Sequence, residues 1–229
     1  MPEGSKDIYL SLAFGSVPES DGSSKRDLFL VPLVSAQFAN GVFLDMNTVG
    51  IHLSRDPSMN YGLMLTPSFS RVRQRTAQGW ESERKFTPEL GGFFSYGVAH
   101  GLSVRTSLLY GGNADRRGLA LNLGASAWMP VAEHHNVGID LGARLANRSA
   151  LQAGFGVTEE QSMPGLPVYE PHGGMREAGI SAGWRWHFSN KYTFTTKLEY
   201  SRLLGSAARS PHVEQAGGVQ AYGVLTYRY

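Results

Sequence analysis

The chain of 229 residues contains no cysteine, few charged side chains and no long apolar run. The lack of cysteine excludes a disulfide framework, a thiolate nucleophile and any zinc or iron–sulfur site with cysteine ligands. Charged residues make up 17% of the chain, against about 25% in an average soluble protein. The net charge of +2 is too small to predict nucleic-acid binding without a concentrated basic patch, and the sequence shows none. No stretch approaches the roughly 18 apolar residues of a transmembrane helix.

Glycine and aromatic residues are, by contrast, abundant. The chain has 28 glycines in 229 residues, well above the average of about 7%, and 11% of its residues are aromatic. Its mean hydropathy of −0.22 resembles that of a soluble protein. Alternating apolar and polar residues, however, average out in any hydropathy window. The composition therefore favours a β-rich chain without deciding whether it is soluble or spans a membrane.

Alternation of apolar and polar side chains with a period of two predicts β-strands along the whole chain. In residues 192–201, for example, an apolar set alternates with a polar set that includes Lys197 and Glu199. No window shows a convincing helical period, so we expect an almost entirely β protein. Eleven apolar segments can be distinguished, at residues 8–14, 28–38, 42–53, 61–72, 90–98, 102–110, 119–127, 137–145, 178–188, 191–204 and 219–229.

The polar face of these segments distinguishes a soluble β-sandwich or barrel from a transmembrane barrel. It consists mainly of Gly, Ser, Thr and Asn, whereas a solvated sheet face would carry more Lys and Glu. The apolar face ends in aromatic residues, as the girdle at a membrane–water interface requires. These residues are Trp184, Trp186, Phe188, Tyr192, Tyr227 and Tyr229. We therefore predict an all-β fold: one domain over residues 1–229 that forms a transmembrane antiparallel up-and-down β-barrel.

The number of strands depends on residues 42–53. Eleven segments cannot close a bacterial single-chain barrel, because such barrels have an even number of strands. The apolar phase flips within residues 47–50, which indicates either a β-bulge or a tight turn between two short strands. A turn gives twelve strands, which is our prediction. Ten strands are the alternative, if an N-terminal segment does not join the wall.

The lengths of the connections predict an orientation. Residues 99–101, 133–135 and 189–190 form short connections, whereas residues 74–85, 147–175 and 205–218 form long polar ones. Outer-membrane barrels have short periplasmic turns, long external loops and both termini in the periplasm. We therefore expect a monomer in a Gram-negative outer membrane, in contact with its lipid and lipopolysaccharide. The N-terminus holds no apolar stretch of a signal peptide, so we expect a leader to have been removed.

Two stretches resemble a known family. Residues 155–169 read FGVTEEQSMPGLPVY, and residues 198–213 read LEYSRLLGSAARSPHV. They resemble the MipA/OmpV family of outer-membrane proteins, whose members show a Phe-Gly-Val-Ser/Thr run leading to Gly-Leu-Pro-x-Tyr. Those members also show Tyr-x-Arg-Leu-Leu-Gly-Asp-Ala-Ala-Asp-Ser-Pro before the final strand. The chain departs from this pattern at Ser206 and Arg209, where the family usually has aspartates.

This resemblance implies a scaffold or binding protein of the cell envelope without enzymatic activity. The member that gave the family its name brings together a lytic murein transglycosylase and a bifunctional penicillin-binding murein synthase. Both enzymes act on peptidoglycan and would be the expected partners. The alternative function is a small-solute channel of the outer membrane.

Two sets of residues are candidate sites. The first is a cluster of lumen charges formed by Arg185, His187, Lys197 and Glu199, which should pair because an unpaired buried charge is costly. Such a cluster could plug the barrel or form a selective constriction. The second is an external recognition loop stiffened by prolines, which could instead only cap the barrel mouth. Its residues are Gly156, Val157, Gly165, Leu166, Pro167, Tyr169, Ser210 and Pro211.

No residue pattern predicts catalysis, cofactor binding or a metal site. His172 and His212 lie close in sequence to Glu170 and Glu214, but neither spacing matches a catalytic motif. The pair of histidines at residues 134–135 lies in a tight turn, where adjacent side chains diverge and do not easily bind one ion. We therefore expect a protein that is not an enzyme and has no cofactor.

Overall fold

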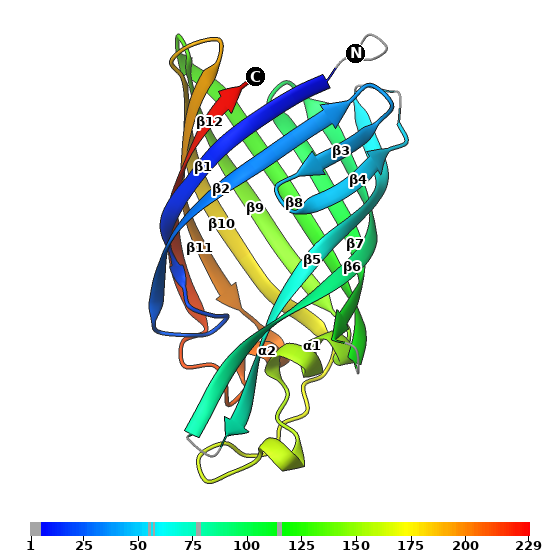
Figure 1. Cartoon of the computed structure of the whole chain (residues 1–229), viewed down its shortest axis with the longest axis vertical. Coiled ribbons are helices and arrows are strands. Elements are labelled where there is room, and N and C mark those ends of the chain that lie inside the picture. Colours follow the sequence, from blue (N-terminus) through cyan, green and yellow to red (C-terminus); the bar gives the residue numbers. More distant parts are fainter. Residues whose placement is uncertain (1–5, 55, 57, 77–78, 114–115) are drawn as a thin grey trace.

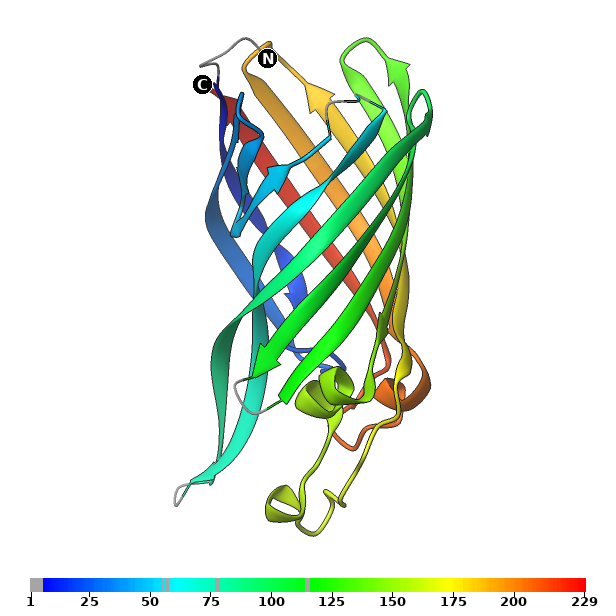
Figure 2. The same cartoon turned by 90° about the vertical axis from the view of Figure 1, so that its right-hand side faces the viewer.

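Twelve antiparallel strands close into one barrel, in which β1 pairs with β12 (Figures 1 and 2). This computed structural model describes residues 6–54, 56, 58–76, 79–113 and 116–229, without the side chains of residues 68–87, 112, 113 and 116. The barrel confirms the predicted fold class and the count of twelve strands rather than ten. The strands are β1 (Lys6–Pro18), β2 (Arg26–Phe38), β3 (Val42–Asp45), β4 (Thr48–His52), β5 (Met59–Thr76), β6 (Gly79–Ala99), β7 (Leu102–Asn113), β8 (Arg116–Ala132), β9 (His135–Ala146), β10 (Gly174–His187), β11 (Tyr192–Leu203) and β12 (Gly217–Arg228).

Short helices interrupt two of the connections, although the sequence analysis predicted none. They are α1 (Arg148–Phe155), the 3-10 helix η1 (Glu159–Gln161) and α2 (Gly205–Ala208). Asn147 caps α1, because its side chain accepts a hydrogen bond from the backbone N–H of Ala150 at 2.9 Å. Nowhere in the described ranges is a helix long and apolar enough to cross a membrane.

The two ends of the barrel differ in what connects the strands. One end, which we call the terminal end, holds Lys6, Tyr229 and the short connections (Figure 1). Gly101 and His134 adopt positive φ angles of 74° and 66° in two of these connections, as tight turns require. The opposite end, which we call the loop end, holds α1, η1 and α2 (Figure 2). The long connections predicted at residues 147–175 and 205–218 therefore lie together, opposite the termini.

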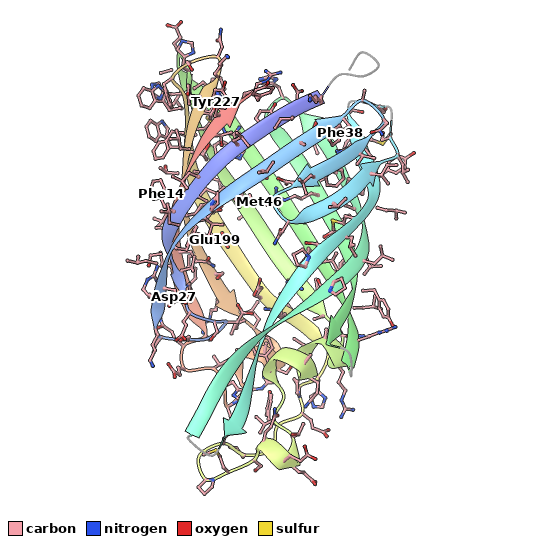
Figure 3. The ribbon with its side chains drawn as sticks, in the orientation of Figure 1. Phe14, Asp27, Phe38, Met46, Glu199 and Tyr227 are labelled. Atoms are coloured by element: carbon pink, nitrogen blue, oxygen red, sulfur yellow. The ribbon has the colours of Figure 1, made fainter. Side chains whose placement is uncertain are left out.

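The apolar side chains of the alternating strands point outwards. Leu63, Ile139 and Leu198 are 54%, 52% and 56% exposed, although they lie within regular strands. Aromatic rings follow one another around the terminal end with centroid separations of 5.1–6.2 Å. Figure 3 places Tyr227 there and Phe14 further down the same outer wall. This inverted arrangement, with apolar residues outside and an aromatic belt at the rim, is that of a barrel in lipid. The rings that follow one another are those of Trp184, Trp186, Phe188, Tyr192 and Tyr227.

Residues 42–53 form a tight hairpin, which is the alternative that we predicted over a β-bulge. Asp45 of β3 pairs with Thr48 of β4, so that Met46 and Asn47 form the turn. Met46 has a φ of 54°. Both strands are short, and β3 pairs with β2 only over three residues, from Ser35 to Gln37.

The prediction of a loop at residues 74–85 was wrong. Strands β5 and β6 stay paired far beyond the barrel body, up to the pair of Thr76 with Gly79 (Figure 1). The polar sequence there misled the prediction, because polarity marks where a strand leaves the lipid and not where backbone pairing ends. Backbone hydrogen bonds between two long strands can continue into water without any apolar face.

Candidate functional site

A network of hydrogen bonds centred on Asp140 lies on the lumen face of β8–β11. Asp140 is only 7% exposed. Its Oδ2 lies 2.5 Å from Nζ of Lys197 and accepts a hydrogen bond from Oγ of Ser181 at 3.2 Å. Its Oδ1 accepts hydrogen bonds from Oγ of Ser126 at 2.6 Å and from Nε1 of Trp128 at 3.3 Å. Donors from three other strands thus surround this carboxylate, which satisfies a buried charge.

The indole of Trp128 lies against two strands that carry glycine at that level. Gly138 and Gly183 pair with each other in the register of β9 and β10. A Cβ atom at Gly138 would lie 2.2 Å from the Trp128 ring, and one at Gly183 would lie 2.6 Å from it. The guanidinium carbon of Arg185 lies 4.7 Å from the ring centroid, within the range of a cation–π contact. The glycines therefore provide the space in which a large ring and a cation fill the lumen.

The four predicted lumen residues do not form one mutually paired cluster, so this part of the prediction needs correction. Lys197 pairs with Asp140, two strands away, and not with Glu199. Arg185 stacks on an indole, and Nδ1 of His187 lies 3.0 Å from a threonine hydroxyl. Glu199 stands opposite a serine of β10 and a glutamine of β12 in the register (Figure 3).

Sequence reasoning missed Asp140 and Trp128 because it compared only charges on adjacent strands. Gly183 stands opposite Lys197, and Gly138 stands opposite Gly183. Because Gly183 has no side chain of its own, the lysine opposite it can cross β10 and reach Asp140 on β9. A glycine on the middle strand, opposite the cation and diagonally across from the anion, is the signal that would have found this ion pair.

Connections at the loop end pack into what we call the loop cap, which consists of residues 19–25, 147–173 and 204–216. Helix α1 contacts β5, β7, β8 and β9, and α2 contacts β10, so the cap rests on the wall at this end. The loop cap holds a cluster of buried apolar side chains, in contrast to the outward-facing wall. The buried members of this cluster are Leu151, Phe155 and Ala207 of the cap, together with Ala146 and Leu203 at the adjoining ends of β9 and β11.

Polar contacts connect the three segments of the loop cap. Arg176, at the start of β10, forms an ion pair with Asp21 of the first connection. Oγ of Ser24 donates to Oε2 of Glu214 at 2.6 Å. The backbone N–H of Glu214 in turn donates to the carbonyl of Gly22 at 2.8 Å. The connection between β1 and β2 is thereby held against the connection between β11 and β12.

Several of the residues predicted for a recognition loop lie inside the cap. Val157 is fully buried and exchanges two backbone hydrogen bonds with Tyr169, at 2.9 and 3.0 Å. The hydroxyl of Tyr169 donates to the carbonyl of Ser206 at 2.7 Å. Oγ of Ser210, which is also buried, donates to the carbonyl of Phe155 at 2.6 Å. These side chains hold the cap together rather than face a partner.

The tip of the predicted recognition loop is its accessible part. Gly165 has a φ of +86° and follows a proline, which fits a type II turn. Gly165 and Pro167 are exposed, and Leu166 is half-buried. Gly156, at the end of α1, and Pro211, after α2, are half-buried. A recognition role for this loop stays a prediction, and the geometry limits it to the tip.

Neither candidate catalytic pair is arranged as a catalytic centre. Oε2 of Glu170 lies 2.5 Å from a nitrogen of Arg148, and Glu214 accepts the hydrogen bonds of the loop cap. His134 occupies a turn position, and the ring of His135 stacks on that of Trp184 at 5.6 Å. Across the described ranges, no group of three or more His, Asp or Glu residues is placed to hold a metal ion.

Comparison with known proteins gives a family and a set of structural neighbours. A family model described as "MltA-interacting protein MipA" matches residues 10–229. No curated protein matches the sequence. An outer-membrane channel from Pseudomonas putida F1 is similar in structure, with a TM-score of 0.50, 8% identity and coverage of 100% of this chain and 97% of the channel.

Two further solved structures show the same kind of fold at lower similarity. A loop-deletion mutant of the outer-membrane protein OmpT of Vibrio cholerae has a TM-score of 0.45 and 7% identity, with coverage of 99% of both chains. The translocator domain of the autotransporter NalP from Neisseria meningitidis has a TM-score of 0.43 and 12% identity, with coverage of 100% of this chain and 90% of that domain.

We predict that Lys197→Met destabilises the barrel by about 3–5 kcal/mol, because it leaves the Asp140 carboxylate without its cation in a buried site. Adding Asp140→Asn to this variant should restore most of the loss. Urea unfolding in phospholipid vesicles, followed by tryptophan fluorescence, measures both effects. Lys191→Met, in the exposed turn before β11, is the matched control and should cost no more than about 0.5 kcal/mol. Equal losses in the two single variants would contradict the importance of this ion pair.

We also predict that Leu151→Ala loosens the loop cap by about 2–5 kcal/mol, because the leucine is 1% exposed in the cap core. Faster hydrogen exchange and proteolysis in residues 147–173 would report this change, while heat-modifiable gel mobility should show an intact barrel. Val168→Ala, at an exposed position in the same segment, is the control. Unchanged exchange in Leu151→Ala would show that the cap does not depend on this core.

Proposed function

The chain belongs to the MipA family of MltA-interacting proteins, and on that premise we propose that it is a non-enzymatic scaffold of the bacterial outer membrane. The proposal rests on one observation, the match of the family model over residues 10–229. The partner named in the family description is MltA, which we take to be a lytic murein transglycosylase. A bifunctional penicillin-binding murein synthase is the second partner that the scaffold would bring to it.

The terminal end is the surface that we propose for docking. Murein enzymes act in the periplasm, and short turns together with both termini are typical of the periplasmic end of outer-membrane barrels. At this end His100, Glu133, His134 and Lys191 are exposed. The short turns hold these polar side chains on a rigid rim, which lowers the conformational entropy that binding would cost.

The proposal predicts direct binding between the purified barrel and a lytic murein transglycosylase of the MltA type. The triple variant His100→Ala/Glu133→Ala/Lys191→Ala should weaken this binding at least about tenfold, or about 1.4 kcal/mol, because it removes polar groups from three turns at once. Surface plasmon resonance on barrels in lipid nanodiscs measures the affinity.

The control is Glu159→Ala/Glu160→Ala, which removes two exposed carboxylates of η1 at the loop end. Its affinity for the transglycosylase should equal that of the unmodified barrel. Binding lost in the η1 variant and kept in the turn variant would place the docking surface at the loop end instead. No binding by the unmodified barrel would remove the scaffold proposal.

The lumen network supports a plugged barrel rather than the alternative of a small-solute channel. Four side chains from neighbouring strands contact one another in the lumen. They are those of Trp128, Arg185, Asp140 and Lys197. We predict that the unmodified barrel gives no reproducible single-channel steps in a planar lipid bilayer. Steps whose size changes in Arg185→Ala or Glu199→Ala would instead establish a channel.

A further inference from the structure

The barrel wall contains a break between β2 and β5 on the loop-end side of the short β3–β4 hairpin. Strand β2 pairs with β3 only at residues 35–37, and β4 pairs with β5 only as far as Leu65. In the part of the chain that the structure describes, no strand pairs with the free edge of β2 over residues 26–34 or with that of β5 from Thr66 onwards. Figure 1 shows this region between β2 and β5, below the hairpin.

The width of the break follows from the hairpin that closes it at the terminal end. Two strands between β2 and β5 separate these by three strand spacings, or about 14 Å. Strands β3 and β4 end at the turn that contains Met46, labelled in Figure 3. On the loop-end side of this turn, neither strand contributes to the wall. The side chains of Thr48 and Thr66 meet there, with their hydroxyl oxygens 2.8 Å apart.

Prolines mark both sides of the break as true edges. Pro32 lies in the part of β2 that pairs only with β1, and Pro67 lies in the part of β5 that pairs only with β6. Proline has no backbone N–H to donate to a ladder, so in sheets it is confined to edge strands, strand ends and bulges. Each proline removes one backbone donor from its strand, which makes the two edges poorer templates for a β-strand of another chain.

Strand β2 is apolar on both faces beside the break. Every residue from 28 to 34 is apolar, in contrast to the alternating pattern of the other strands. Leu28 and Leu30 point outwards and are 87% and 67% exposed. Val31 lies on the lumen face, where a serine or threonine would be usual, and is still 42% exposed. A continuous apolar run of this length is typical of a strand that is covered by apolar material on both sides.

We propose that this break is a lateral binding site for an acyl chain of an outer-membrane lipid, which enters between β2 and β5 and lies against the lumen face of β2. The outward leucines belong to the apolar band of the barrel and place the break at the level of the hydrocarbon, so acyl chains are the apolar material that surrounds it. On the lumen face of β2, the side chains of Phe29, Val31 and Leu33 form an apolar surface that continues from the outer wall into the lumen. The acyl chain covers the exposed valine, and the prolines make pairing of the edges with a protein strand less favourable.

The absence of cysteine makes a direct test possible, because a single introduced cysteine can be labelled without background. Val31→Cys carries a bimane fluorophore in barrels reconstituted into dioleoylphosphatidylcholine vesicles or into vesicles of its dibrominated analogue. Bromine on the acyl chains quenches only a fluorophore that touches them. Two controls carry the same label. They are Leu198→Cys, on the lipid-facing side of β11, and Val224→Cys, on the lumen face of the intact wall at β12.

The proposal expects a loss of fluorescence at position 31 comparable to that at position 198, with no loss at position 224. Heat-modifiable gel mobility checks that each labelled barrel is folded. If the first variant does not fold, Leu33→Cys, on the same face two residues further, replaces it with the same expectation. Quenching at positions 31 and 33 no greater than at position 224 would overturn the proposal. Shielding of position 31 together with a cross-linked dimer would overturn it in favour of a second copy of the chain.

Discussion

The pairing of backbone hydrogen bonds inside hydrocarbon is the constraint on which the rest of this structure depends. Lipid offers no partner for a peptide N–H or C=O, so a strand that crosses the membrane needs a neighbour on each side. Twelve strands satisfy this need around most of the wall by closing on themselves, with Tyr9 through Ser16 of β1 paired to β12. Beside the break, β2 over residues 26–34 and β5 from Thr66 onwards have a neighbour on one side in the described part of the chain. Once the wall is closed, the alternation of side chains determines which residues face each side of it. One set must suit lipid, and the other must fit a narrow lumen.

The lumen shows how a confined polar space is filled. A charge there is stable only if its partners are within reach, and partners can reach across strands only where small residues leave room. Gly138 and Gly183 leave that room, so Trp128 lies over two strands and Lys197 crosses one to meet Asp140. The many glycines and the few charges of the composition are therefore related. Each charge in the lumen needs several small residues around it, so that its partner can reach it.

Period and polarity predicted the wall because both follow from the strand geometry alone. The phase flip in residues 42–53 allowed a bulge or a turn, and the even number of strands that a barrel needs favoured the turn, which is the β3–β4 hairpin. The same reasoning failed at residues 74–85, where β5 and β6 stay paired in water. It also failed for Asp140, whose cation stands two strands away, since the sequence gives neighbours along a strand but not the reach of a side chain across it. The helices α1 and α2 were missed because each is too short to show a helical period.

The loop end is stabilised by burial of apolar side chains, unlike the wall, and this explains the role of the family motif. Outside the lipid, water again drives apolar side chains together, so the loop cap has a buried core that the wall does not need. The motif around residues 200–211 supplies Leu203 and Ala207 to that core and Ser210 to a buried hydrogen bond. These motif residues are thus explained by folding of the cap, without any partner. The proposed docking of murein enzymes concerns the terminal end, where the turns need only be short and polar. Because the folding of the cap accounts for these motif residues at the loop end, the motif carries no information about the proposed docking surface at the terminal end.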